Sequence, residues 1–197
     1  MDEEPRKGDR VQQAAIRTTR KDHPAGDLRE IFLAHHRQVY RAAWRITGNA
    51  GDAEDVLQTV FLKLLRKDAR TLDPQGLAAY LRIAAVNTAL DLLRSRRAAR
   101  SAGLRPAEPE EIEVPSGAPG PEAEQREREL REALRLSMAS LGPTAARIVA
   151  LRFLEGYDNR EIARLLGQTR ASVAVTLHRA RRKIQNDLGP LWAGERQ

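Results

Sequence analysis

The chain has 197 residues and a formal net charge of +7, with 34 lysine and arginine residues against 27 acidic ones. This length suits one or two small domains, and the positive charge favours a polyanionic partner. The lack of cysteine excludes disulfides and thiolate-based zinc sites and is compatible with a reducing cytoplasm.

Enzyme motifs are also missing from the sequence. The four histidines have no partners at metal-ligand spacing, and neither a glycine-rich phosphate loop nor a nucleophile elbow is present. We therefore expect no catalysis, no metal and no cofactor. A secretory signal, a lipidation signal and a long apolar span are not expected either, which argues against membrane insertion.

The first 26 residues are polar and charged, and we expect a flexible tail there. Asp27 is a suitable N-cap for a first helix, in which apolar side chains recur at helical spacing. That stripe consists of Leu28, Ile31, Phe32, His35, Val39, Ala43 and Ile46. The glycines at 48 and 51 end the pattern.

A second helix is expected from Asp52 to Leu65, with one apolar face and one acidic, polar edge. The edge consists of Asp52, Asp55, Gln58 and Thr59. Carboxylates in a first turn suit the helix dipole, so ordinary capping explains this edge more simply than a docking surface does.

A polar loop at 66–76 precedes a third helix, expected from about Leu77 to Ala98. The end of this helix is dense in cations: Arg94, Arg96, Arg97 and Arg100. Cations suit a helix C-terminus in any protein, but this cluster exceeds what a cap requires. It therefore favours a phosphate-contacting surface.

Composition changes after Ser101, where proline, glycine and glutamate replace the arginines. Such a segment cannot form a packed element, so we expect an extended acidic linker at 101–124. It either solubilises the chain or occupies a groove built for nucleic acid. Two helices follow, one with Leu130, Leu134, Met138 and Leu141, and one that begins at Pro143 and carries Ile148, Val149, Leu151 and Phe153.

Residues 159–184 have the pattern of a short helix, a turn at Gly167 and a longer basic helix. In the longer helix one buried stripe is predicted from Val173, Leu177, Ala180, Ile184 and Leu188. Its other faces carry Arg170, Ser172, Thr176, Arg179, Arg181, Arg182 and Lys183. A charge run is often only a solvated face, but this arrangement is typical of a helix-turn-helix that binds the DNA major groove.

No segment alternates with period two, so no sheet is expected. The sequence predicts an all-α protein with two separate small helical domains, at 27–100 and 125–190. On the residues alone, the chain could be a stand-alone helix-turn-helix regulator whose first domain senses a signal or dimerises.

Three stretches, in this order, resemble bacterial extracytoplasmic-function (ECF) sigma factors, the minimal two-domain initiation factors of RNA polymerase. Residues 52–65, DAEDVLQTVFLKLL, are similar to region 2.2 of that family. Residues 79–97, AYLRIAAVNTALDLLRSRR, are similar to regions 2.3 and 2.4. Region 4 is matched by RIVALRFLEGYDNREIARLLG at 147–167 followed by SVAVTLHRAR at 172–181. The resemblance covers about residues 28–188.

The resemblance implies a sigma factor that binds core RNA polymerase, directs it to promoter DNA and melts the −10 element. It implies core polymerase contacts at Asp52, Asp55, Gln58 and Phe61. Contacts with the −10 element are implied at Arg66, Arg70, Asn87, Arg94, Arg96 and Arg97. Contacts with the −35 element are implied at Arg170, Ser172, Thr176, Arg179 and Arg181. It further implies a cytoplasmic location, a linker that threads the RNA channel of the polymerase, and an anti-sigma partner between the two domains.

The recognition helix departs from the family pattern at three positions. Relatives often carry Lys-Ser-Arg where this chain has Ala174, Val175 and Thr176. Either this protein reads an unusual −35 element, or its second domain relies more on Arg170 and Arg179.

Overall fold

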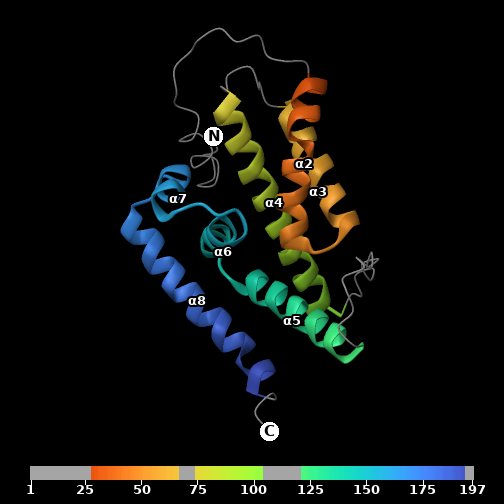
Figure 1. The fold of residues 1–197 in the computed structure, drawn as a ribbon, viewed down its shortest axis with the longest axis vertical. Coiled ribbons are helices and arrows are strands. Elements are labelled where there is room, and N and C mark those ends of the chain that lie inside the picture. The colour runs from red at the N-terminus through yellow and green to blue at the C-terminus, as the bar shows by residue number, and fades with distance from the viewer. Residues whose placement is uncertain (1–27, 67–73, 104–120, 194–197) are drawn as a thin grey trace, which may run out of the picture.

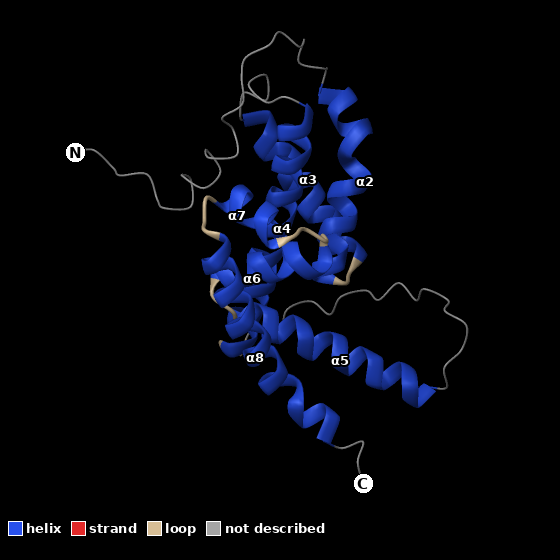
Figure 2. Ribbon diagram, turned by 60° about the vertical axis from the view of Figure 1, so that its left-hand side comes forward, coloured by secondary structure: helices blue, strands red, loops and turns tan. Residues whose placement is uncertain are grey.

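The computed structural model describes residues 28–66, 74–103 and 121–193, and every regular element in these ranges is helical (Figures 1 and 2). The predicted all-α class is confirmed. The expected N-terminal tail, the cap at Asp27, the side chain of Arg70 and most of the expected linker lie outside the described residues.

The first domain consists of three helices that lie side by side: α2 (Leu28–Thr47), α3 (Ala50–Arg66) and α4 (Pro74–Ser101) (Figure 1). Gly48, with a φ of 65°, makes the turn between α2 and α3. Asn49 then caps α3, since its Oδ1 accepts a hydrogen bond of 2.9 Å from the backbone N–H of Asp52. For this reason α3 begins two residues before the predicted start at Asp52.

The second domain consists of α5 (Pro121–Ser140), α6 (Pro143–Val149), a π-helical turn η2 (Ala150–Leu154), α7 (Asn159–Leu166) and α8 (Arg170–Ala193). Because α5 begins at Pro121, the last residues of the expected linker are helical. Pro143 stands in the first turn of α6, as predicted.

The central helix of the molecule is α4, which contacts α2, α3, α5 and α6. The segment Gly76–Ser101 of this helix is long enough and apolar enough to cross a membrane, contrary to the sequence expectation that no such span exists. The apolar side chains of this helix are largely packed against its neighbours, as in the core helix of a soluble domain; the buried ones include Leu81, Val86 and Leu90.

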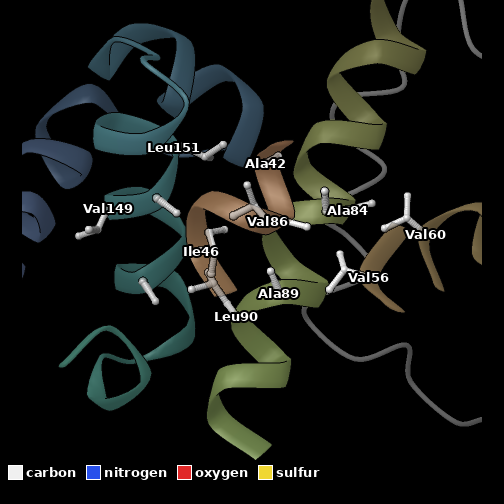
Figure 3. Packing of buried hydrophobic residues seen from close by; sticks show 14 of the residues in the cluster. Ala42, Ile46, Val56, Val60, Ala84, Val86, Ala89, Leu90, Val149 and Leu151 are labelled. Carbon is white, nitrogen blue, oxygen red and sulfur yellow. The ribbon is translucent and has the colours of Figure 1, made fainter. Parts of the chain in front are cut away.

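The two domains are packed together rather than separate, which differs from the sequence expectation. Their buried apolar residues form one cluster, in which Ile46 of α2 and Leu90 of α4 lie on one side of the second domain's α6 and Val149 points from its other side (Figure 3). Some predicted core residues lie outside this cluster and are exposed: Phe32 at 39%, Leu134 at 38% and Phe153 at 52%.

Candidate nucleic-acid interface

The helix-turn-helix is fixed at both ends of α7 by local hydrogen bonds. The Oδ1 of Asp158 accepts the N–H groups of Arg160 and Glu161 at 2.7 Å, and Oε2 of Glu161 accepts the N–H of Asp158 at 2.7 Å. This capping box satisfies donors that a helix start leaves unpaired, and the Glu161 N–H is the main cause of a lowered Asp158 pKa. At the other end Gly167 has a φ of 62°, the left-handed conformation predicted for the turn.

One side of α8 is buried against the second domain, and the predicted stripe is confirmed. Val173, Ala180 and Leu188 are buried, while Leu177 and Ile184 are partly buried. This packing fixes the rotation of α8 about its axis. Residues outside the stripe therefore face away from the domain.

The residues proposed for the −35 element lie mainly on those outward faces. Arg170, Ser172, Arg179 and Arg181 are exposed, whereas Thr176 is partly buried. The Arg181 guanidinium lies over the Phe153 ring, with 5.6 Å from its central carbon to the ring centroid. A cation held over an aromatic face is partly ordered, so Arg181 is oriented before any ligand arrives.

Of the residues proposed for the −10 element, those that the structure describes lie at the end of α3 and along α4. Arg66 is exposed, while Asn87 and Arg94 are partly buried on the same side of α4. Arg94 Nη1 donates to Asp91 Oδ1 at 2.7 Å. Within the described residues, Asn87 Oδ1 and the Nε and Nη2 atoms of Arg94 are buried without a hydrogen-bond partner. Unpaired buried polar atoms cost free energy, so this side of α4 holds unused hydrogen-bonding capacity.

The acidic edge expected on α3 is smaller than the sequence suggests. Asp52 is buried, not exposed, because it forms an ion pair with Arg96 of α4. Burial raises the Asp52 pKa, and the Arg96 guanidinium opposes that shift. Asp55 and Gln58 remain exposed on α3, as does Arg97 on α4.

A groove of about 510 Å³ lies between α2 and α3 on the outer face of the first domain. Phe32, Tyr40 and Leu57 give it an apolar floor, and Glu54 and Gln58 lie among its polar lining residues. Phe61 is buried, and its ring meets the Phe32 ring edge to face at a centroid distance of 4.9 Å. Phe61 therefore supports the groove through Phe32.

Two family models match the chain: Sigma-70 region 2 at residues 31–99 and Sigma-70 region 4 at residues 131–184, together more than half of the chain. It is also 31% identical over 160 residues to the ECF RNA polymerase sigma factor SigE of Mycolicibacterium smegmatis. The chain belongs to the ECF sigma factor family. The SigE match covers 81% of this chain and 60% of SigE, so the chain spans less than two thirds of that relative's length.

Other sigma factors show how widely this similarity extends. The ECF sigma factor SigM of Mycobacterium tuberculosis is 29% identical over 175 residues, covering 87% of this chain and 84% of SigM. The probable sigma factor RfaY of Xanthomonas campestris is 33% identical over 165 residues, covering 80% of this chain and 39% of RfaY. Among solved structures, the sigma factor RpoE of Bartonella quintana, in complex with the anti-sigma factor NepR, matches with a TM-score of 0.50 and 19% identity, covering 83% of this chain and 97% of that one. At this identity the structural match shows the fold alone.

In this sigma factor one polar contact between region 2 and region 4 is made by Glu155, directly after the π turn. Glu155 pairs with Arg45 of α2 at 3.3 Å and with Arg82 of α4 at 3.5 Å. Arg45 also donates to the Leu154 carbonyl at 2.9 Å, and Arg82 donates to the Tyr157 hydroxyl at 2.7 Å. One carboxylate of region 4 thus joins two arginines of region 2.

Two further contacts place charged groups of region 4 beside the arginine-rich part of α4. Glu132 of α5 forms an ion pair with Arg100. Arg147 of α6 is partly buried, and this burial lowers its pKa, while Asp91 and Arg94 of α4 act on it electrostatically. The side of α4 that carries Asn87, Asp91 and Arg94 is therefore turned towards region 4.

Sequence reasoning missed Glu155, because a glutamate before a glycine looks like ordinary loop composition. Its partners Arg45 and Arg82 are 110 and 73 positions away in the sequence, and only the packed chain brings the three together. The capping role of Asp158 could have been found, since Asp158 and Glu161 have the spacing of a capping box.

Proposed function

We propose that this chain is a promoter-specificity subunit, which binds core RNA polymerase, directs it to particular promoters and promotes DNA melting. The observation that carries the proposal is a helix-turn-helix with exposed arginines joined to a region 2 domain whose α4 presents further polar and basic groups. It performs no chemistry itself and requires no cofactor. We place its action in the cytoplasm, where promoter DNA is accessible.

The first turns of α8 enter the major groove of the −35 element. The buried stripe turns Arg170, Ser172 and Arg179 away from the protein, as a recognition helix requires. Arginine suits this position because its planar guanidinium can bind guanine edges or phosphates through two hydrogen bonds.

The −10 element binds along α4 and the end of α3. Extruding a base costs a few kcal/mol of stacking free energy, which contacts to the base and phosphates must offset. Asn87 and Arg94 have unpaired polar atoms for this purpose, and Arg97 supplies positive charge one turn beyond Arg94, whereas Arg96 lies on the other side of α4 and is paired with Asp52. Arg66 at the end of α3 is proposed to contact the same element, as is Arg70, which lies outside the described residues.

Core polymerase docks on the outer face of α2 and α3. Exposed Asp55 and Gln58 lie beside the apolar groove, which therefore offers both a buried contact area and a charged rim. Asp52 and Phe61 support this surface indirectly. Asp52 holds α4 in place, and Phe61 holds Phe32 in place.

The packed arrangement of the two domains belongs to the free chain, and the domains separate when the polymerase and promoter bind. The side of α4 proposed to bind the −10 element is turned towards α6, so it becomes fully available only after separation. An anti-sigma partner of the kind bound to the Bartonella relative would act by favouring a conformation closed to DNA.

Transcription with purified components tests the proposal. The chain, added to core polymerase, should yield transcripts that start at specific promoters, and sequencing those transcripts gives both promoter elements. If no template supports promoter-dependent transcription while the chain alone binds DNA specifically, the stand-alone regulator is correct instead.

A variant test addresses the −35 contact. Arg179→Ala should weaken binding to −35 DNA by about 1–3 kcal/mol if Arg179 contacts a base. Arg131→Ala on α5 is the matched control, because Arg131 is exposed but pairs only with Glu127 on its own helix among the interactions described. Equal affinities and equal salt dependence for the two variants would remove Arg179 from the interface.

A further inference from the structure

The part of α8 that faces furthest from the domain core is apolar near its start. With about 100° between successive residues, Ala171, Val175 and His178 fall on a line roughly opposite the buried stripe. Ala171 and Ala174 are exposed, and Val175 is 49% exposed. The first residues of a recognition helix to reach the groove floor would therefore carry methyl groups.

This apolar line has no packing role within the part of the chain that the structure describes. Buried Val173 and Ala180 lie on the opposite side of α8, Arg179 lies beside the line, and Arg182 continues the line one turn beyond His178. A β-branched valine is also a mediocre helix former at an exposed position. Val175 therefore does not improve the packing or the helix.

The major groove presents one apolar group, the C5-methyl of thymine, beside polar edges on every base pair. Valine and alanine side chains can gain free energy only by burying that methyl group, since covering a polar base edge would remove its hydrogen bonds to water. The neighbouring Arg179 and Arg182 suit phosphates or guanines next to that contact.

We propose that Val175, together with Ala171, makes the −35 specificity of this protein a preference for thymine methyl groups. Relatives often carry lysine and arginine at the positions of Ala174 and Thr176. In this chain, contacts to thymine methyl groups take the place of the contacts that those two cations would make. The inference rests on the proposed function, because it requires α8 to lie in the major groove of promoter DNA.

The test uses full-length protein with core polymerase on a promoter that the complex selects. Each −35 thymine is replaced singly by deoxyuridine, which removes the methyl group and leaves base pairing unchanged. Burying one methyl group contributes about 0.8 kcal/mol, so one or two replacements should weaken promoter binding about four-fold each. Deoxyuridine between the two promoter elements serves as the DNA control.

The protein variant then assigns the effect to Val175. Val175→Ala should weaken binding to the thymine promoter and abolish the difference between thymine and deoxyuridine at the affected position. Because Val175 is half-exposed and alanine is the better helix former, the thermal unfolding midpoint should not fall. Leu134→Ala, at another partly exposed apolar residue of region 4, should retain the four-fold difference.

Two results overturn the inference and leave the proposed function intact. One is promoter-dependent transcription with equal binding to thymine and deoxyuridine at every −35 position; the other is a selected −35 element without thymine. Failure to transcribe from any promoter would instead refute the proposed function, and the inference with it.

Discussion

The Glu155→Gln variant should shift the free chain from the packed arrangement towards one with separated domains. Glu155 is the carboxylate that joins Arg45 and Arg82 across the domain contact. Glutamine has nearly the same shape and retains one acceptor oxygen, so the substitution removes charge without leaving a cavity.

The two ion pairs of Glu155 set the size of the effect. The Glu155 side chain is only 5% exposed, whereas Arg45 is 48% and Arg82 is 30% exposed. The Arg45 contact has hydrogen-bond geometry but Arg45 is half-exposed, whereas Nε of Arg82 attracts the carboxylate by charge without a hydrogen bond. A solvent-screened ion pair contributes about 0–1 kcal/mol, so from the two pairs we expect a total loss of about 1–2 kcal/mol, or about 5–30-fold in the ratio of packed to separated chains.

The absence of cysteine makes the measurement direct, because two introduced cysteines can carry a fluorophore pair without background labelling. Ser95 on α4 and Gln185 on α8 are exposed positions in different domains. Energy transfer between them should fall in Glu155→Gln. Affinity for core polymerase should rise, since fewer chains must open before binding.

Glu127→Gln is the matched control, since Glu127 loses the same charge but pairs with Arg131 on its own helix. Equal energy transfer and equal core polymerase affinity in the parent, Glu155→Gln and Glu127→Gln would refute the argument. Glu155 would then not hold the two domains together.

Three further predictions concern docking and the helix-turn-helix. Asp55→Lys should reduce co-purification with core polymerase while leaving thermal unfolding unchanged, because Asp55 is exposed; unaltered co-purification would reject that surface. Gly167→Ala should lower the free energy of unfolding by about 1–2 kcal/mol in denaturant titrations, whereas Gly51→Ala, in a helix with room for a methyl group, should not. The lowered pKa of Asp158 means that its carboxylate stabilises the fold above the unfolded value near 3.8 and that this stability is lost as pH falls through the folded pKa. Asp158→Asn should therefore keep the cap but flatten the acid limb of the stability–pH curve, and an unchanged limb would contradict this.

The helices and their buried faces could be predicted from the sequence wherever one helix packs on its own domain. Val173 and Ala180 are buried because helical spacing alone places them on one side of α8. The turn at Gly167 followed from glycine's freedom to adopt positive φ.

Contacts between distant segments could not be predicted in this way. Asp52 in a first turn has the pattern of an exposed capping residue, and its burial follows from Arg96, which lies 44 positions later. Phe153 has helical spacing with the core, but the π turn carries it outwards, where it lies beneath Arg181. The packing of the two domains likewise depends on Arg45, whose role no local pattern indicates.

The buried, unpaired polar atoms of Asn87 and Arg94 limit the stability of the packed arrangement of the two domains. Each leaves part of its hydrogen-bonding capacity unmet among the described residues, so closure carries a penalty that opening to water or nucleic acid relieves. The Asn87→Leu variant would remove that penalty, and it would do so only in the packed arrangement of the two domains. Such a variant would fold more stably yet start transcription less often. The stability of the protein and its activity in transcription initiation would therefore change in opposite directions.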